Sequence, residues 1–420
     1  MTKKISFILI LVFFAYLVIE ILGMVSYYVV FQELYSKKQV KKLITQILEV
    51  ENVEFTNKSD SAGDVWVGNQ VEVIHPYFGY FRDPERNQGI TNQGFPSYQK
   101  KQDLNKKNDQ INIAVFGGSF AKGTYFLGIE DLKKCFKFAN KKVNIVNFAI
   151  GGYKQPQQLM VLNYLILMGA HFDIVINIDG FNEVALPFVE NIKNKVSPFY
   201  PRNWLYRARD INDPVITKIT SKIYFLTSVR RVVSRSVKEY KLYRSPTLTL
   251  IWRIIDNSIN LRLAMTQDHL KEAIGSKNLG FAVKGPEYRF DSKEGMYDDL
   301  ADVWMRSSIS MKYLCDSYRI KYFHFIQPNQ YDPDSKKFTS KERKIAFDPG
   351  HPYRNGVLNG YPKLRERGKQ LIENGVNFKD LTYIFNENEE LLYSDTCCHL
   401  NEQGYKLIVE KICEFIHNNE

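Results

Sequence analysis

Two segments of the sequence hold side chains that could act together as a nucleophile and a base. The first is Gly117-Gly118-Ser119, where an apolar run turns into a helical pattern and a serine hydroxyl follows two glycines. The second lies near the C-terminus, where His399 follows Asp395 by four positions. A hydroxyl, an imidazole and a carboxylate that orients the imidazole can together perform nucleophilic acyl transfer. Ser119, His399 and Asp395 are therefore the candidate catalytic residues.

Two other segments could supply hydrogen-bond donors to the same site. Gly152 lies in a glycine loop after an apolar run, where side chains do not shield the backbone N–H groups. Asn182 follows the next apolar run and offers a side-chain amide. Donors of this kind stabilise the oxyanion of acyl transfer, and a serine at a helix N-terminus adds its own N–H. Each residue alone also fits a turn or a helix cap, so only their joint appearance favours chemistry.

Apolar runs of strand length precede these residues and alternate with helical patterns. The predicted strands cover residues 111–116, 143–148, 173–178, 321–326 and 376–378, and the predicted helices cover residues 155–168, 300–318 and 402–416. Strands that alternate with helices predict a parallel sheet with helices on both faces. The active site of such a domain is expected at the carboxyl ends of the strands.

The order of these segments resembles the SGNH hydrolase superfamily, also called GDSL esterases and lipases, over residues 111–182 and 320–417. The resemblance implies a three-layer α/β/α flavodoxin-like domain and acyl-ester chemistry. It also implies roles for single residues. Ser119 would be the nucleophile and a donor through its N–H, Gly152 and Asn182 would complete the oxyanion hole, and His399 would be the base held by Asp395.

The sequence departs from the family pattern at two positions. Gly118 stands where the family name implies Asp, a side chain without a catalytic role. The family spaces its last Asp and His three apart, whereas Asp395 and His399 are four apart. Either the extra residue bulges out and Asp395 still reaches the imidazole, or another group, such as Asp380 or a backbone carbonyl, orients His399.

Further segments are similar to uncharacterised membrane-anchored bacterial members of the family that are associated with envelope polysaccharides; they lie at residues 75–80, 92–95 and 327–331. This resemblance implies a serine esterase for acyl groups, in particular acetyl groups, on a cell-envelope glycan. An O-acyltransferase would use the same site with a sugar hydroxyl in place of water. A third possibility is an inactive glycan-binding or assembly protein, its site degraded by the altered Asp…His spacing.

The N-terminus predicts attachment to a membrane. Residues 5–31 are apolar or aromatic except for Glu20 and a few small residues, which is long enough to cross a bilayer. A cleaved signal peptide would have a shorter apolar region and a small-residue cleavage site. We expect a transmembrane anchor at 1–31, a helical stalk at 32–69, a small β-rich segment at 70–110 and the hydrolase-like domain at 111–420. Lysines flank both ends of the anchor, so the distribution of positive charge does not predict its orientation in the membrane. The resemblance to envelope-associated members implies a single-pass protein of the cell membrane with an extracytoplasmic catalytic domain.

The basic excess of the chain is local. Residues 191–255 hold 14 Lys or Arg and 3 Asp or Glu, and the remainder of the chain has 43 of each. This argues against a nucleic-acid binder and favours one surface that meets anionic lipid or an acidic polymer, unless the charge merely faces solvent. The segment belongs to a helical insertion at about 191–290, either a lid over the active site or a helical pair on the sheet edge.

No pattern in the sequence indicates a cofactor. The glycine turn before Ser119 lacks the Lys and spacing of a phosphate-binding loop and the third Gly of a dinucleotide fingerprint. The histidines and cysteines show no HExxH or Cys-x-x-Cys arrangement, so no metal is expected. Five cysteines leave at least one thiol without an intramolecular disulfide, and Cys397 and Cys398 are expected to pack in the core.

Overall fold

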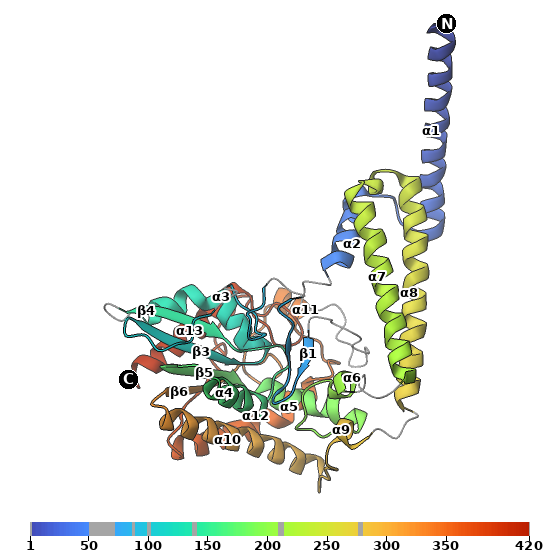
Figure 1. Ribbon diagram of the computed structural model, residues 1–420. Helices are drawn as coiled ribbons and strands as arrows, with labels where there is room; N and C mark the ends of the chain where they lie inside the picture. The colour runs from blue at the N-terminus through green and yellow to red at the C-terminus, as the bar shows by residue number, and fades with distance from the viewer. Residues whose placement is uncertain are drawn as a thin grey trace. The chain divides into compact units, whose positions relative to one another are not determined.

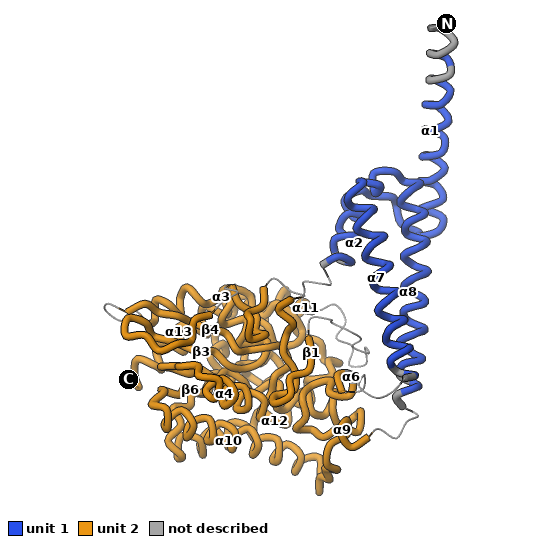
Figure 2. The backbone as a smooth tube through the Cα atoms, viewed as in Figure 1, with its two compact units in different colours: residues 1–56, 67–69, 210–278 blue, residues 57–66, 70–209, 279–420 orange. Residues whose placement is uncertain are grey.

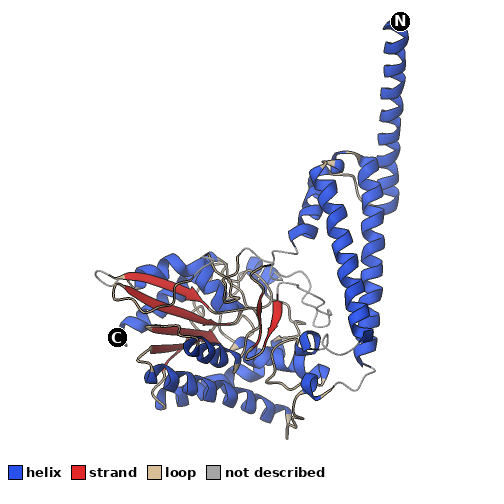
Figure 3. Cartoon of the chain, viewed as in Figure 1, coloured by secondary structure: helices blue, strands red, loops and turns tan. Residues whose placement is uncertain are grey.

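Five parallel strands form the central sheet of the protein (Figures 1 and 3). In the computed structural model, which describes residues 2–49, 72–85, 89–98, 102–136, 141–208, 214–275 and 280–419, their order is β4-β3-β5-β6-β7. The strands are β3 (Gln110–Gly117), β4 (Lys142–Asn147), β5 (Ile174–Asp179), β6 (Lys321–Ile326) and β7 (Asn377–Asp380). This is the strand order 2-1-3-4-5 of flavodoxin-like domains. The predicted α/β class is confirmed, and the strand boundaries lie within a few residues of the predicted ones.

Helices cover both faces of the sheet because alternate strand residues are apolar on both sides. Along β3, Ile113 and Val115 face the hydrophobic cluster under α3 (Ser119–Cys135) and α13 (Glu402–His417). Ala114 and Phe116 face the opposite cluster, which includes residues of α4 (Gln157–Leu167), α10 (Lys293–Ser317) and α12 (Arg354–Glu373). The three-layer arrangement that the sequence resemblance implies is therefore present.

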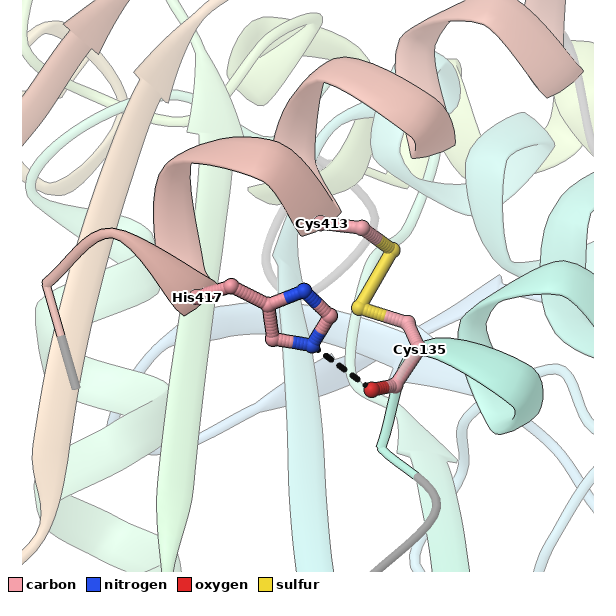
Figure 4. The surroundings of a disulfide bond; sticks show 3 residues. All are labelled: Cys135, Cys413 and His417. Atoms are coloured by element: carbon pink, nitrogen blue, oxygen red, sulfur yellow. Dashed lines mark hydrogen bonds between the residues drawn. A yellow bond between two sulfur atoms is a disulfide. The ribbon is translucent and has the colours of Figure 1, made fainter.

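A disulfide joins the two helices of one face. Cys135, at the end of α3, is bonded to Cys413 near the end of α13 (Figure 4). The Nε2 atom of His417 lies 2.9 Å from the carbonyl oxygen of Cys135, within hydrogen-bond distance. The helix that begins at Ser119 is thereby tied to the helix that follows His399.

The predicted β-rich segment contains a two-stranded antiparallel sheet formed by β1 (Glu72–His75) and β2 (Gly79–Arg82). Residues 70–71, 86–88 and 99–101 of the segment lie outside the described residues. Tyr80 donates a hydrogen bond to the carbonyl oxygen of Gly151 at 2.9 Å, and Tyr153 donates one to the carbonyl oxygen of Tyr80. The segment thus supports the glycine loop after β4 from the side.

A second compact unit comprises residues 1–56, 67–69 and 210–278, and all the regular secondary structure among its described residues is helical (Figure 2). Its main helices are α1 (Thr2–Phe31), α2 (Lys37–Glu49), α7 (Pro214–Glu239) and α8 (Pro246–Gly275). α1 is long and apolar enough to cross a membrane. Of the predicted stalk, residues 50–69 lie outside the described residues.

The helical insertion is divided between the two units. Its long helices, α7 and α8, pack on each other and on α2 around a small core of Val40, Ile44, Ile47, Val237 and Trp252. The short helices α6 (Trp204–Ala208) and α9 (Phe281–Lys284) belong to the unit that contains the sheet, as do α5 (Phe181–Leu186) and α11 (Ser340–Ala346). The sequence interpretation, a lid or a pair of helices on the sheet edge, did not include packing of α7 and α8 on the N-terminal helices.

Candidate active site

Ser119 begins α3 directly after a sharp turn at the end of β3. Gly117 has a φ of +140°, and a Cβ at this position would lie 2.1 Å from the carbonyl oxygen of Ile178 on β5. Only glycine fits where the two strands approach so closely. The turn leaves the Ser119 N–H among the unbonded donors of the helix N-terminus, where partial positive charge favours a developing anion.

His399 lies between Ser119 and Asp395. Its Nε2 atom is 2.8 Å from Oγ of Ser119, and its Nδ1 atom is 2.5 Å from Oδ2 of Asp395. The structure therefore brings together three residues that are up to 280 positions apart in the chain. A serine, an imidazole and a carboxylate in this sequence of contacts form a proton-transfer chain.

The four-residue spacing is accommodated by the backbone of the loop. Oδ1 of Asp395 accepts hydrogen bonds from the N–H groups of Cys397, Cys398 and His399, at 2.8, 3.0 and 3.2 Å. The loop wraps around one carboxylate oxygen and leaves the other for the imidazole. Asp380, the other candidate carboxylate, accepts a bond from the Thr382 N–H at 2.8 Å.

The charges around the imidazole favour its protonated form. Burial alone would lower the pKa of His399, but the negative charges of the Cys398 thiolate and the Asp395 carboxylate raise it well above its usual value. Burial would also raise the pKa of Asp395, yet the hydrogen bonds and charge of His399 together with the backbone N–H groups hold it below its usual value. Asp395 is thus ionised at neutral pH and stabilises an imidazolium.

The two remaining candidate donors, Gly152 in the loop after β4 and Asn182 in α5, lie on segments that border Ser119. A Cβ added at Gly151 would stand 3.8 Å from the Cβ of Ser119, so the glycine loop after β4 passes beside the serine. A Cβ added at Gly118 would stand 2.2 Å from Nδ2 of Asn182. The Asn182 amide therefore occupies the space beside Gly118, and one of its N–H bonds reaches the Tyr153 carbonyl oxygen at 2.8 Å.

Glu183 joins the loop that carries Gly152 to the turn before α5, a role that the sequence interpretation missed although the residue directly follows Asn182. Its Oε1 accepts a bond from the N–H of Gln155 at 2.9 Å, and its Oε2 accepts one from the N–H of Gly180 at 2.8 Å. Burial, together with the charge of Asp179, raises the pKa of Glu183 to about 8. The side chain fixes the loop after β4 against the turn after β5.

Arg202 is a second residue that the sequence interpretation did not identify. A Cβ at Gly152, whose φ is +80°, would stand 1.7 Å from Cδ of Arg202, so the arginine side chain lies across the glycine. The guanidinium binds both carboxylate oxygens of Glu190, at 3.0 and 2.6 Å, and Tyr353 donates to Glu190 at 2.7 Å. No regular spacing relates these residues, which come from distant segments.

Cys397, Cys398 and His399 could together hold a soft metal ion, since their ligand atoms lie within 4.8 Å of one another. However, both ring nitrogens of His399 are already within hydrogen-bond distance of Asp395 and Ser119. A metal bound to either nitrogen would displace one of these contacts. We therefore derive no chemical step from a metal at this position.

No sequence-family model and no curated protein match the chain. Among solved structures, a GDSL-like lipase from Bacteroides thetaiotaomicron is 10% identical and aligns over 76% of this chain and 93% of its own, with a TM-score of 0.36. An acylhydrolase from Bacteroides fragilis is 12% identical and aligns over 76% of this chain and 91% of its own, with a TM-score of 0.35. An acetyl xylan esterase is 13% identical and aligns over 72% of this chain and 98% of its own, with a TM-score of 0.34.

Proposed function

We propose that this chain is a membrane-anchored serine esterase of the SGNH type. The observation that carries the proposal is the continuous contact from Ser119 through His399 to Asp395. Two further supports are the N-terminus of α3 at the serine and the Asn182 amide beside Gly118. This combination supplies a nucleophile, a base, an orienting acid and donors for an oxyanion.

In the proposed reaction, His399 removes the proton from the Ser119 hydroxyl through Nε2 while Oγ attacks the carbonyl carbon of the ester. The carbonyl oxygen becomes an oxyanion that accepts hydrogen bonds from the N–H groups of Ser119 and Gly152 and from the amide of Asn182. His399 then gives its proton to the departing alcohol, and the acyl group stays on Ser119. Water, deprotonated by His399, attacks this acyl-enzyme and releases the acid.

The proposed substrate is an acetyl ester on a cell-envelope glycan. The long apolar helix α1 supports placement at a membrane. The disulfide between Cys135 and Cys413 supports an oxidising, extracytoplasmic compartment, because cytosolic thiols are kept reduced. A glycan at the cell surface would be within reach of a domain anchored in this way.

The contacts of His399 favour an enzyme over an inactive glycan-binding protein, because the altered spacing leaves Asp395 on the imidazole. An O-acyltransferase would share every step up to the acyl-enzyme. The two reactions differ only in whether water or a sugar hydroxyl attacks the carbonyl carbon of the acyl group on Ser119. They are separated by adding an acceptor sugar to the assay and measuring acetate release against acetylated sugar.

The proposal is tested by acetate release from acetylated xylo-oligosaccharides and from 4-nitrophenyl acetate. The full chain in detergent micelles is the appropriate material, because α7 and α8 pack on α2. We expect release by the wild type and a background rate for Ser119→Ala. Equal rates for both proteins would refute the proposed chemistry.

A further inference from the structure

Helix α1 carries one acidic residue in its apolar sequence, and the start of α8 surrounds it. Glu20 accepts hydrogen bonds from the Ser245 hydroxyl at 2.6 Å and from the Thr247 N–H at 3.3 Å. The Thr247 hydroxyl donates to the carbonyl oxygen of Ile19 at 3.0 Å. The partial positive charge at the N-terminus of α8 stabilises the Glu20 carboxylate. These contacts fix the start of α8 beside Glu20 of α1.

From Glu20 onward, α1 and α8 run side by side (Figure 2). Gly23 lies against Thr247, since a Cβ at this glycine would stand 2.3 Å from the threonine hydroxyl. Farther along, the Arg253 guanidinium lies over the Phe31 ring at 4.5 Å, and Tyr27 is buried. In contrast, the N-terminal half of α1 extends beyond the turn between α7 and α8.

The turn between α7 and α8 is basic and aromatic. It carries Lys238, Lys241 and Arg244, and Tyr240 is 74% exposed. None of the three cations forms a salt bridge with any residue that the structure describes. Such a group of cations does not enter the hydrocarbon core of a bilayer, whereas lysine, arginine and tyrosine are favoured where the core meets the headgroups.

The position of this turn limits how much of α1 crosses the bilayer. The apolar residues 5–19 lie between Lys4 and Glu20 and would extend roughly 22 Å at about 1.5 Å per residue. This length is shorter than the hydrocarbon thickness of about 30 Å, and snorkelling of Lys3 and Lys4 together with local thinning of the bilayer covers the difference. The turn therefore comes to the membrane surface when residues 5–19 span the core.

The start of α8 and the C-terminal half of α1, which lie beside each other, also expose apolar side chains. On α8, Leu248, Ile251, Ile254 and Ile255 are between 42% and 50% exposed. The adjoining part of α1 exposes further residues, namely Met24, Val25, Tyr28, Val29 and Val30. An apolar surface next to a cluster of cations is typical of helices that lie in the headgroup zone.

We infer that the α7–α8 turn and the first three turns of α8 lie in the headgroup zone of the membrane beside α1, where Lys238, Lys241 and Arg244 bind phosphates of anionic phospholipids. The inference rests on the membrane anchoring that forms part of the proposed function. It assigns the apolar residues of α8 to contact with lipid acyl chains near the surface. The protein would then be held by α1 across the membrane and by α8 on its surface.

Depth-dependent quenching tests this inference on the full chain reconstituted into vesicles of phosphatidylcholine and phosphatidylglycerol. An environment-sensitive fluorophore is attached at one of three exposed positions through Val12→Cys, Ile251→Cys or Leu261→Cys. Leu261 is the matched control, because it is 64% exposed on the same helix but lies about 15 Å farther along it. Brominated lipids should quench the fluorophore at positions 12 and 251 and leave position 261 unaffected.

The outcomes separate the inference from the anchoring on which it rests. Loss of quenching at position 12 as well as at 251 would mean that α1 does not span the membrane. Quenching at 12 without quenching at 251 would overturn the inference alone. A blue-shifted but unquenched fluorophore at 251, together with a doubled mass in detergent, would assign this face to a second copy of the chain and likewise overturn it.

The role of the cations is tested by replacing them together, as Lys238→Gln, Lys241→Gln and Arg244→Gln. Quenching at position 251 should fall in this triple variant. For the protein with Lys238, Lys241 and Arg244 intact, it should also fall in vesicles of phosphatidylcholine alone and at high salt. Quenching at position 12 should stay the same in all three experiments. The control variant makes the same charge change at exposed positions of the sheet-containing unit, as Lys341→Gln, Lys369→Gln and Lys379→Gln. Equal behaviour of the two triple variants would exclude phosphate binding by the turn.

Discussion

The chemistry of the proposed site depends on how one loop holds one carboxylate. Three consecutive backbone N–H groups bind Oδ1 of Asp395, so the side chain cannot rotate away from His399 without losing all three bonds. Since the carboxylate remains ionised, it stabilises the protonated imidazole. The base is then available only above the usual histidine pKa of about 6.5, and esterase activity should rise with pH through the alkaline side of neutrality.

Asp395→Asn should lower kcat by about 10⁴, because an amide favours the wrong imidazole tautomer. The substitution also removes a charge that raises the pKa of His399, so the acidic limb of kcat/KM should move to lower pH. Stopped-flow measurement of ester hydrolysis between acidic and alkaline pH checks both effects. Asp380→Asn is the matched control, and an equal loss in the two variants would exclude Asp395 as the orienting acid.

Gly118→Ala tests the Asn182 donor from the opposite side. The new methyl group would stand 2.2 Å from Nδ2 of Asn182 and force the amide away from Ser119. Loss of one oxyanion donor typically lowers kcat by about 10²–10³. Gly280→Ala is the control, since a Cβ there meets nothing within 4 Å; a kcat close to wild type for Gly118→Ala would remove Asn182 from the oxyanion hole.

Residue types were more predictable than residue partners. The types and order of Ser119, Gly152, Asn182 and His399 could be read from short motifs. The first three follow strands whose apolar runs are local in sequence, and His399 precedes a helix with a local apolar pattern. Whether Asp395 reaches His399 depends on the path of one loop, which local spacing does not determine. Arg202 and its partner Glu190 have no motif, because they approach Gly152 only through the packing of distant segments.

At the scale of elements, two helices position the proposed nucleophile and the proposed base. α3 begins at Ser119, α13 begins three residues after His399, and the Cys135–Cys413 disulfide joins their far ends. The sheet that supports both helices was predictable, since buried parallel strands are continuous apolar runs. α12 was not, because Gly356 and Gly360 interrupt its apolar pattern in order to pack closely on Val184 and Ala185 of α5.

Cys413→Ser should destabilise the sheet-containing unit without altering catalysis. Removing a disulfide of this kind typically lowers the free energy of unfolding by about 2–4 kcal/mol. Ester hydrolysis at 25 °C should be unchanged, because the bond lies at the opposite end of α3 from Ser119. Thermal unfolding monitored by circular dichroism is the measurement. A reductant should lower the midpoint of the wild type but not that of the variant; a midpoint insensitive to reductant in both would show that the disulfide does not form.

At the scale of the whole molecule, the local basic excess is partly neutralised within the protein. Arg202 binds Glu190, Arg207 binds Glu72 and Arg230 binds Asp256. Charge counting along residues 191–255 could not separate these paired cations from those that face outward. The sequence also did not predict that α7 and α8 pack with the N-terminal helices, because this packing depends on contacts between segments about 200 residues apart.

Deleting residues 1–69 should make the remaining chain aggregate. Val40, Ile44 and Ile47 of α2 cover Val237 and Trp252, and each buried apolar side chain contributes about 1.5–3 kcal/mol. A shorter deletion of residues 1–18 removes the projecting part of α1 and keeps these contacts. Gel filtration and binding of a hydrophobic dye distinguish the two fragments; a monodisperse 70–420 fragment would show that α7 and α8 do not need α2.

The central claim, that Ser119 is a nucleophile activated by His399, is tested most directly by a fluorophosphonate probe, which reacts with activated serines. The full chain in detergent is incubated with the probe, and the labelled peptide is identified by mass spectrometry. We predict a single adduct on Ser119 in the wild type, none in Ser119→Ala, and a strongly slowed reaction in His399→Ala. Labelling that persists in Ser119→Ala, or that proceeds at the wild-type rate in His399→Ala, would contradict the account.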